Sequence, residues 1–199
     1  MYEVELKLRA DHGPVRDALS QREATPAERV VQVDTYFDAP HRSFAETDEA
    51  LRLRRERVVP ADGETRDGDG ETAVGDGPGR ETAVLTYKGP LVEAASKTRR
   101  ELQTGVESGE ELEALLGALG FEPAATVTKE RERYDLEGYT LGLDAVEGLG
   151  EFVEIECEVE SEGDIAPARE GAASLLADLG LDPDDQVRTS YLGLLLAED

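Results

Sequence analysis

Charged and apolar residues alternate along several short segments of this sequence, and a β-strand with such a pattern carries its charges on one face. The clearest examples are YEVELKLR (2–9), ALRLR (50–54) and FVEIECEVE (152–160). Carboxylates can bind a metal ion and clustered cations can bind a polyanion. The basic residues of these faces are Lys7, Arg9, Arg52, Arg54, Lys88, Arg99, Lys129, Arg131 and Arg133, and the acidic ones are Glu3, Glu5, Glu101, Asp144, Glu154, Glu156 and Glu158.

These strand faces do not share the composition of the whole chain. The 199 residues include 46 Asp or Glu against 21 Lys or Arg, a net charge of −25, whereas the strand faces hold slightly more basic than acidic residues. An ordinary antiparallel sheet with one solvated face is the simpler interpretation, but its polar face would be expected to share the acidic excess. We therefore favour a closed or nearly closed barrel with a charged lumen, whose apolar faces point outward under amphipathic helices.

A charged lumen is costly unless its charges pair with one another or with a ligand. A highly charged polyanion requires several Lys and Arg residues around it. Carboxylates in the same cavity would repel that anion unless a divalent cation lay between them. Mg²⁺ is commonly held by one or two carboxylates together with substrate phosphates. Both kinds of charge in one lumen therefore predict a metal-bound triphosphate.

The elements that position these residues are eight strands and three or four helices. Period-two alternation predicts the strands, whereas capping residues and the spacing of apolar residues predict the helices. The expected strands are 2–9, 31–38, 51–58, 83–88, 97–106, 126–135, 139–145 and 151–160, and the expected helices are 11–23, 108–120, 165–179 and one from Asp182-Pro183 through SYLGLLL (190–196). The predicted fold class is α+β, an eight-stranded antiparallel β-barrel with helices packed outside.

The length suits one domain, to which we assign residues 1–199. Residues 59–82 are rich in Gly and acid, and we interpret them as a long hairpin connection, with a lid over a site as the alternative. His12 and His41 lie in polar, turn-like segments and are predicted to be surface residues. The single Cys157 excludes a disulfide framework and is interpreted as a small core residue.

The acidic charge restricts the partners of this protein. Nucleic acid and anionic membranes would be repelled, and neither a membrane span nor a signal segment is evident, so a cytoplasmic protein is expected. The basic residues are 17 Arg and only 4 Lys. A carboxylate-rich surface almost without Lys suggests a salt-rich cytoplasm in which counterions screen the self-repulsion. Halophilic behaviour is therefore a hypothesis that the composition raises, while the oligomeric state is left open.

Several ordered motifs of this chain resemble those of the CYTH superfamily, which groups class IV adenylyl cyclases with thiamine and inorganic triphosphatases. The opening Glu3-Val-Glu5-Leu-Lys7 resembles the family's ExExK motif, and SYLGLLL resembles its closing helix. Further similar motifs are DTYFDAP (34–40), LRLR (51–54), TYKGP (86–90), KTRRE (97–101), VTKERERY (127–134) and DAVEGLGEFVEIE (144–156). The resemblance implies an antiparallel barrel called a triphosphate tunnel, in agreement with the strand count above.

The resemblance also implies roles for the charged residues. Mg²⁺ or Mn²⁺ would be held by Glu3, Glu5, Asp144, Glu154 and Glu156. The phosphates would be bound by Lys7, Arg52, Arg54, Lys88, Arg99, Lys129, Arg131 and Arg133. Arg99 is preferred over Arg100 because it shares its strand face with Glu101.

Two reactions fit such a site. In a cyclase, the ribose 3′-hydroxyl of ATP attacks the α-phosphorus and pyrophosphate leaves, whereas in a triphosphatase water attacks the terminal phosphorus. DTYFDAP, TYKGP and EGLGEFVEIE are most similar to the class IV cyclases, so conversion of ATP to cyclic AMP is the favoured activity. Lys7 would act either as the general base or as a phosphate ligand. Hydrolysis of tripolyphosphate or thiamine triphosphate is the alternative, and a binding module without turnover is the second alternative.

Overall fold

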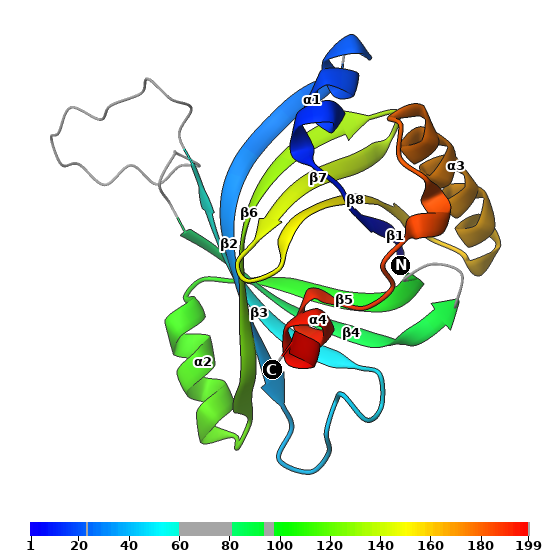
Figure 1. The fold of residues 1–199 in the computed structure, drawn as a ribbon. Coiled ribbons are helices and arrows are strands. Elements are labelled where there is room, and N and C mark those ends of the chain that lie inside the picture. The colour runs from blue at the N-terminus through cyan, green and yellow to red at the C-terminus, as the bar shows by residue number, and fades with distance from the viewer. Residues whose placement is uncertain (23, 60–80, 94–97, 199) are drawn as a thin grey trace, which may run out of the picture.

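The computed structural model describes residues 1–22, 24–59, 81–93 and 98–198, which form a closed antiparallel barrel (Figure 1). Its eight strands follow the order β1-β5-β4-β3-β2-β6-β7-β8 around the barrel. They are β1 (Tyr2–Arg9), β2 (Thr25–Asp38), β3 (Ala50–Val58), β4 (Glu81–Glu93), β5 (Thr98–Val106), β6 (Glu122–Leu136), β7 (Tyr139–Val146) and β8 (Gly150–Val159). The predicted eight-stranded antiparallel barrel is thus confirmed.

The described residues form four α-helices, of which three pack outside the barrel as predicted, whereas the C-terminal one lies across one end of it, against Val127, Val146 and Phe152 (Figure 1). The helices are α1 (His12–Gln21), α2 (Gly109–Ala118), α3 (Ile165–Asp178) and α4 (Tyr191–Glu198), and the described residues also include the short 3-10 helices η1 (Glu162–Asp164) and η2 (Pro183–Asp185). The side chain of Ser108 accepts a hydrogen bond from the backbone N–H of Glu111 and so caps α2. Within the described ranges, no helix is both long and apolar enough to span a membrane.

The main hydrophobic core lies outside the barrel wall, not within it. On β1, Val4, Leu6 and Leu8 are at most 2% exposed. Leu6 and Leu8 belong to a cluster that also contains apolar residues of α1, α3, β7 and β8. Burial of each such aliphatic side chain contributes about 1.5–3 kcal/mol. Because alternate residues of a strand point to opposite faces, covering the apolar face with helices turns the charged face into the lumen.

The strand register determines which charged residues meet there. Residues directly opposite each other in an antiparallel pair lie on the same face. Glu5 lies opposite Glu156 and Lys7 opposite Glu154 across β1 and β8. Arg99 lies opposite Glu3, whereas Arg100 lies opposite Tyr2. The register therefore places Arg99 on the lumen side, as the sequence predicted.

Two strands begin at least four residues earlier than the sequence indicated. The predicted starts were residues 31 and 126, but β2 begins at Thr25 and β6 at Glu122. These two strands pair with each other along their whole lengths, from Thr25 opposite Asp135 to Asp38 opposite Glu122. Pairing at this distance along the chain outweighs the weak strand propensity of the first residues of each strand.

The final helix is also shorter than predicted. The expected helix from Asp182-Pro183 is interrupted, because η2 ends at Asp185 and α4 begins only at Tyr191. The side chain of Asp182 caps η2 through the backbone N–H of Asp184, and the backbone N–H of Val187 donates to the Lys7 carbonyl at 2.6 Å. This tertiary hydrogen bond holds the intervening segment against β1 and prevents a continuous helix.

Two further predictions concern loops and histidines. Most of the long connection predicted at 59–82 lies outside the described residues, which resume at Glu81. The prediction that His12 is a surface residue is wrong, since it is only 3% exposed. Its Nε2 lies 3.0 Å from the Phe152 carbonyl, and its backbone N–H donates to the Glu151 carboxylate at 2.8 Å. His12 thus joins the start of α1 to β8.

Candidate active site in the barrel lumen

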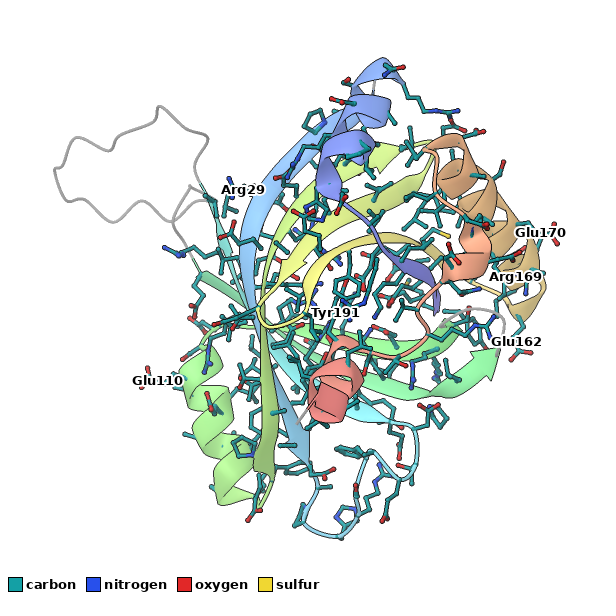
Figure 2. The ribbon with its side chains drawn as sticks, viewed as in Figure 1. Arg29, Glu110, Glu162, Arg169, Glu170 and Tyr191 are labelled. Carbon is teal, nitrogen blue, oxygen red and sulfur yellow. The ribbon has the colours of Figure 1, made fainter. Side chains whose placement is uncertain are left out.

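The barrel encloses a cavity of about 620 Å³ whose lining is densely charged. Side chains fill the interior in Figure 2, where Tyr191 reaches inward from the start of α4. The basic lining residues are Lys7, Arg52, Arg54, Lys88, Arg99, Lys129 and Arg131, and the acidic ones are Glu3, Glu5, Asp34, Asp48, Glu49, Glu154, Glu156 and Glu158. The cavity is therefore near charge balance in a chain of net charge −25.

The two kinds of charge occupy different parts of the barrel wall. Strands β1 and β8 are adjacent, and Lys7 of β1 is the one cation that they add to the lining. Their acidic lining residues are Glu3 and Glu5 of β1 and Glu154, Glu156 and Glu158 of β8. The strands β3, β4, β5 and β6 contribute the other six cations. We refer to β1 and β8 as the acidic wall and to these four strands as the basic wall.

The best-buried part of the site is an ion cluster around Asp144. Its carboxylate accepts from Arg131 Nε at 2.5 Å and from Lys129 Nζ at 2.7 Å. Arg131 also contacts Glu154, which lies 3.9 Å from Lys7 Nζ. Burial opposes ionisation of Asp144, but Arg131 and Lys129 outweigh it and hold the pKa of this carboxyl below its ordinary value. Burial, together with Arg131, lowers the pKa of Lys129.

A second cluster, beside the basic wall, is organised by Asp34 of β2. Its two oxygens accept from Arg54 Nε and Nη2, each at 2.7 Å, and Arg52 lies 3.6 Å away. This bidentate geometry fixes the plane of the guanidinium group. Burial would raise the pKa of Asp34, but Arg52 and Arg54 hold it well below the usual range. Asp34 therefore remains ionised and orients both arginines.

A third cluster joins the two walls through Lys88. Its ammonium lies 3.1 Å from Glu3 and also contacts Glu101. Burial opposes ionisation of Glu3, but Lys88 and Arg52 lower its pKa to about 2. Burial and the charge of Glu3 raise the pKa of Glu101 to about 7, against the opposing effect of Lys88. Two acids sharing one cation thus differ strongly in their affinity for a proton.

Two residues predicted for the site do not line the cavity. Arg133 is bound by Glu28 and Glu56, the latter with Nη2 and Oε2 2.5 Å apart. Asp144 is fully buried, and its oxygens are used by Lys129, Arg131 and the Tyr191 hydroxyl. The structure therefore brings together the other residues predicted for the site, and places these two behind or beyond the cavity.

The carboxylates of the acidic wall are the groups that could bind a divalent cation. Glu5 and Glu156 are directly opposite each other. Burial, together with Glu3, Glu154 and Glu5, raises the pKa of Glu156, against the effect of Arg131. This excess of carboxylate charge would be relieved by a cation. Among the described residues no three acidic, His or Cys side chains form a ready-made metal cluster. The donors thus fit a metal bound by one or two carboxylates and shared with substrate phosphates.

Sequence reasoning did not select several residues that the structure places in the site. Asp34 belongs to the DTYFDAP motif, and its position two residues before Tyr36 puts both on one strand face. Gln32 continues that face and is fully buried, with its side-chain nitrogen near Glu56. Tyr191 was assigned only to the closing helix, and no local pattern indicates that its ring enters the barrel.

Comparisons with known proteins agree with the fold. A sequence profile described as the CYTH domain matches residues 1–191. A protein of Methanocaldococcus jannaschii is 33% identical over 195 residues, with 98% of each chain covered, and its name gives adenylate cyclase as a provisional assignment. A solved structure from Pyrococcus horikoshii is 35% identical, covers 99% of each chain and has a TM-score of 0.83.

A more distant structure shares the fold alone. It comes from Hippeastrum, is 19% identical with a TM-score of 0.62, and covers 100% of this chain and 96% of its own. It is described as a provisionally assigned adenylyl cyclase with a dominant triphosphatase activity.

Proposed function

The chain belongs to the CYTH domain family, and from that membership we propose that it is a metal-dependent enzyme that converts ATP to cyclic AMP and pyrophosphate in the barrel lumen, as a class IV adenylyl cyclase. Similar proteins are named as a provisionally assigned adenylate cyclase or described as a triphosphatase. A triphosphate substrate is common to both activities.

The observation that carries the proposal is the apolar part of the cavity lining. Ala45, Ala50, Leu192 and Leu196 line the cavity in addition to the charged residues. A bare triphosphate needs only cations, whereas a nucleoside also needs apolar surface. The cavity volume of about 620 Å³ lies within the range of pockets that hold ligands of nucleotide size. Both features support a nucleotide in preference to inorganic tripolyphosphate.

The basic wall supplies the groups for the phosphates. Arg52 and Arg54, oriented by Asp34, present planar donors, while Lys88, Lys129 and Arg131 add charge from the neighbouring strands. These groups would neutralise the phosphates, hold the α-phosphorus in line with the ribose 3′-hydroxyl and stabilise the leaving pyrophosphate. Arg99, which donates to Asp48 and to the Gly89 carbonyl, lies at the edge of this group.

The acidic wall supplies the metal ligands in this proposal. Glu3, Glu5 and Glu156 would hold Mg²⁺ or Mn²⁺ together with the phosphates, and Glu154 would contribute after release from its ion pairs with Arg131 and Lys7. When bound, the metal would offset the repulsion between substrate and carboxylates and increase the acidity of the attacking hydroxyl. Lys7, which is 1% exposed between the two walls, would accept the proton or bind a phosphate oxygen.

Triphosphate hydrolysis is the second candidate. The paired carboxylates Glu5 and Glu156 could orient a water molecule as well as a metal. The Hippeastrum protein, described as dominantly a triphosphatase, has the same fold and could differ only in which nucleophile reaches phosphorus.

The test is a product assay of the purified protein in molar KCl with Mg²⁺ or Mn²⁺. ATP and tripolyphosphate are offered separately, and cyclic AMP, pyrophosphate and orthophosphate are resolved. Equal amounts of cyclic AMP and pyrophosphate are expected from ATP. Orthophosphate without cyclic AMP would identify a triphosphatase, and tight binding without any product would identify a binding module.

Two matched variants connect the activity to the lumen. Lys7→Met should abolish turnover. Arg16→Met should leave turnover unchanged, because Arg16 pairs with Glu132 at 2.8 Å outside the cavity. Full activity of Lys7→Met would exclude Lys7 from the reaction.

A further inference from the structure

Tyr191 is the first residue of α4, yet its side chain is buried in the barrel and only 7% of the residue is exposed (Figure 2). Its ring centroid lies 4.9 Å from that of Phe152, with an interplanar angle of 70°. A purely hydrophobic role would require nothing more than this edge-to-face contact.

Tyr191 belongs to an apolar cluster with Val127, Val146 and Phe152, but it also contacts charged groups of the lumen. Lys7 Nζ lies 4.0 Å from the ring centroid and Lys129 Nζ lies 5.0 Å from it. The hydroxyl donates to Asp144 Oδ2 at 2.9 Å. One side chain therefore contacts two cations, one from each wall, and the carboxylate that binds the second cation.

Simple electrostatics explains why such a residue is needed. Glu154 lies 3.9 Å from Lys7 Nζ and 3.8 Å from Lys129 Nζ, so these two buried like charges share one carboxylate as well as the ring of Tyr191. An aromatic face attracts an ammonium group, and the attraction grows when both are desolvated. Burial, together with Glu154 and Asp144, raises the pKa of Tyr191 well above its ordinary value, so the hydroxyl stays a neutral donor.

We propose that Tyr191 is a positioning residue that holds the ammonium groups of Lys7 and Lys129 in the lumen for the phosphates of the substrate. The inference rests on the proposed function only in that the lumen binds a triphosphate. It also gives the C-terminal segment a role, since Val187 is hydrogen-bonded to the Lys7 backbone and Leu192 lines the same cavity. The segment thus fixes Lys7 through both its backbone and its side chain.

The experiment measures binding of tripolyphosphate by calorimetry, without added metal and at constant salt. Tyr191→Leu removes the ring and should weaken binding about tenfold, which is the combined effect of two cation–π contacts of about threefold each. Tyr191→Phe keeps the ring and should restore binding to within about threefold of the unchanged protein. Tyr139→Phe is the matched control, because the Tyr139 hydroxyl donates to the Ala168 carbonyl on α3 and its loss should leave binding unchanged.

A double-mutant cycle separates positioning from general loss of structure. In the Lys7→Met background only Lys129 remains under the ring, so Tyr191→Leu should weaken tripolyphosphate binding about threefold instead of about tenfold. A structural defect would weaken tripolyphosphate binding by the same factor in both backgrounds. Tyr191→Met, which fills a similar volume without an aromatic face, replaces Tyr191→Leu if the latter does not fold.

The outcomes distinguish this inference from the proposed function. The role of Tyr191 would be overturned if Tyr191→Leu bound tripolyphosphate as tightly as the unchanged protein. It would also be overturned if Tyr191→Leu weakened binding as much in the Lys7→Met background as in the unchanged protein. Neither result would affect the proposal that the lumen binds a triphosphate. Binding without formation of cyclic AMP would overturn the cyclase and leave the inference intact. Absence of binding by the unchanged protein would overturn both.

Discussion

Asp34 gives the most direct test of how the basic wall is organised. Asp34→Asn keeps the size of the side chain but removes the charge that faces Arg54 and Arg52. The carboxylate side chain is 4% exposed and is held by Arg54 through two contacts of 2.7 Å. Removing the charge of Asp34 leaves Arg52 and Arg54 facing other cations of the basic wall.

The expected loss of stability follows from the burial of this ion pair. Removing one partner of a buried pair costs about 3–5 kcal/mol, and we take about 3 kcal/mol because this pair borders a cavity. For a chain of this length about 2–4 °C of Tm corresponds to 1 kcal/mol, so Tm should fall by about 6–12 °C. Because Arg52 and Arg54 lower the pKa of Asp34 against the effect of burial, its contribution is present at neutral pH and lost in acid. The difference should therefore shrink below about pH 4.

The assay is thermal unfolding with and without tripolyphosphate. The phosphates would replace the missing carboxylate, so the ligand should raise the Tm of Asp34→Asn more than that of the unchanged protein. Asp48→Asn is the matched control. Asp48 pairs with Arg99 at 2.8 Å but its side chain is 52% exposed, so its loss should cost less than about 1 kcal/mol.

Two results would refute this reasoning. Equal losses of Tm in Asp34→Asn and Asp48→Asn would show that burial does not set the strength of these pairs. A smaller effect of tripolyphosphate on Asp34→Asn than on the unchanged protein would show that Asp34 does not compete with phosphate for Arg54.

The other predictions concern the acids, the excluded arginine and salt. Glu156→Gln should raise the Mg²⁺ concentration needed for half-maximal activity; an unchanged titration would refute its role as a ligand. Because the pKa of Glu101 is raised by burial and Glu3 to about 7, folding takes up a proton there, and stability should be lost as pH rises through 7. Glu101→Gln should therefore raise Tm more at pH 8 than at pH 5, and equal shifts would contradict the assignment. Arg54→Met should raise the KM for the triphosphate at least tenfold, whereas Arg133→Met should change it less than about twofold, because Arg133 lies outside the cavity. Tm should rise from low salt to molar KCl, since counterions screen the net charge of −25, and a flat or falling curve would remove the halophilic hypothesis.

The sequence by itself determined the inside-out character of the barrel. Period-two alternation in β1 and β8 assigns every residue to one of two faces, and only one arrangement buries Val4, Leu6 and Leu8 under helices. The same parity places Glu3, Glu5 and Lys7 in the lumen and selects Arg99 over Arg100. These predictions needed no knowledge of distant contacts, because the face of a residue in a strand is a local property.

Tertiary structure decided which charged residues share an ion pair and which reach the cavity. Arg131 and Arg133 have the same parity on β6, yet Arg131 lines the cavity while Arg133 is taken by Glu28 and Glu56. Their depth in the barrel depends on the stagger of the strands, which no single segment encodes. Asp34 and Tyr191 reach Arg54 and Asp144 across 20 and 47 residues of sequence. The first contact depends on the register of the paired strands β2 and β3, and the second arises only when the C-terminal helix packs against the barrel.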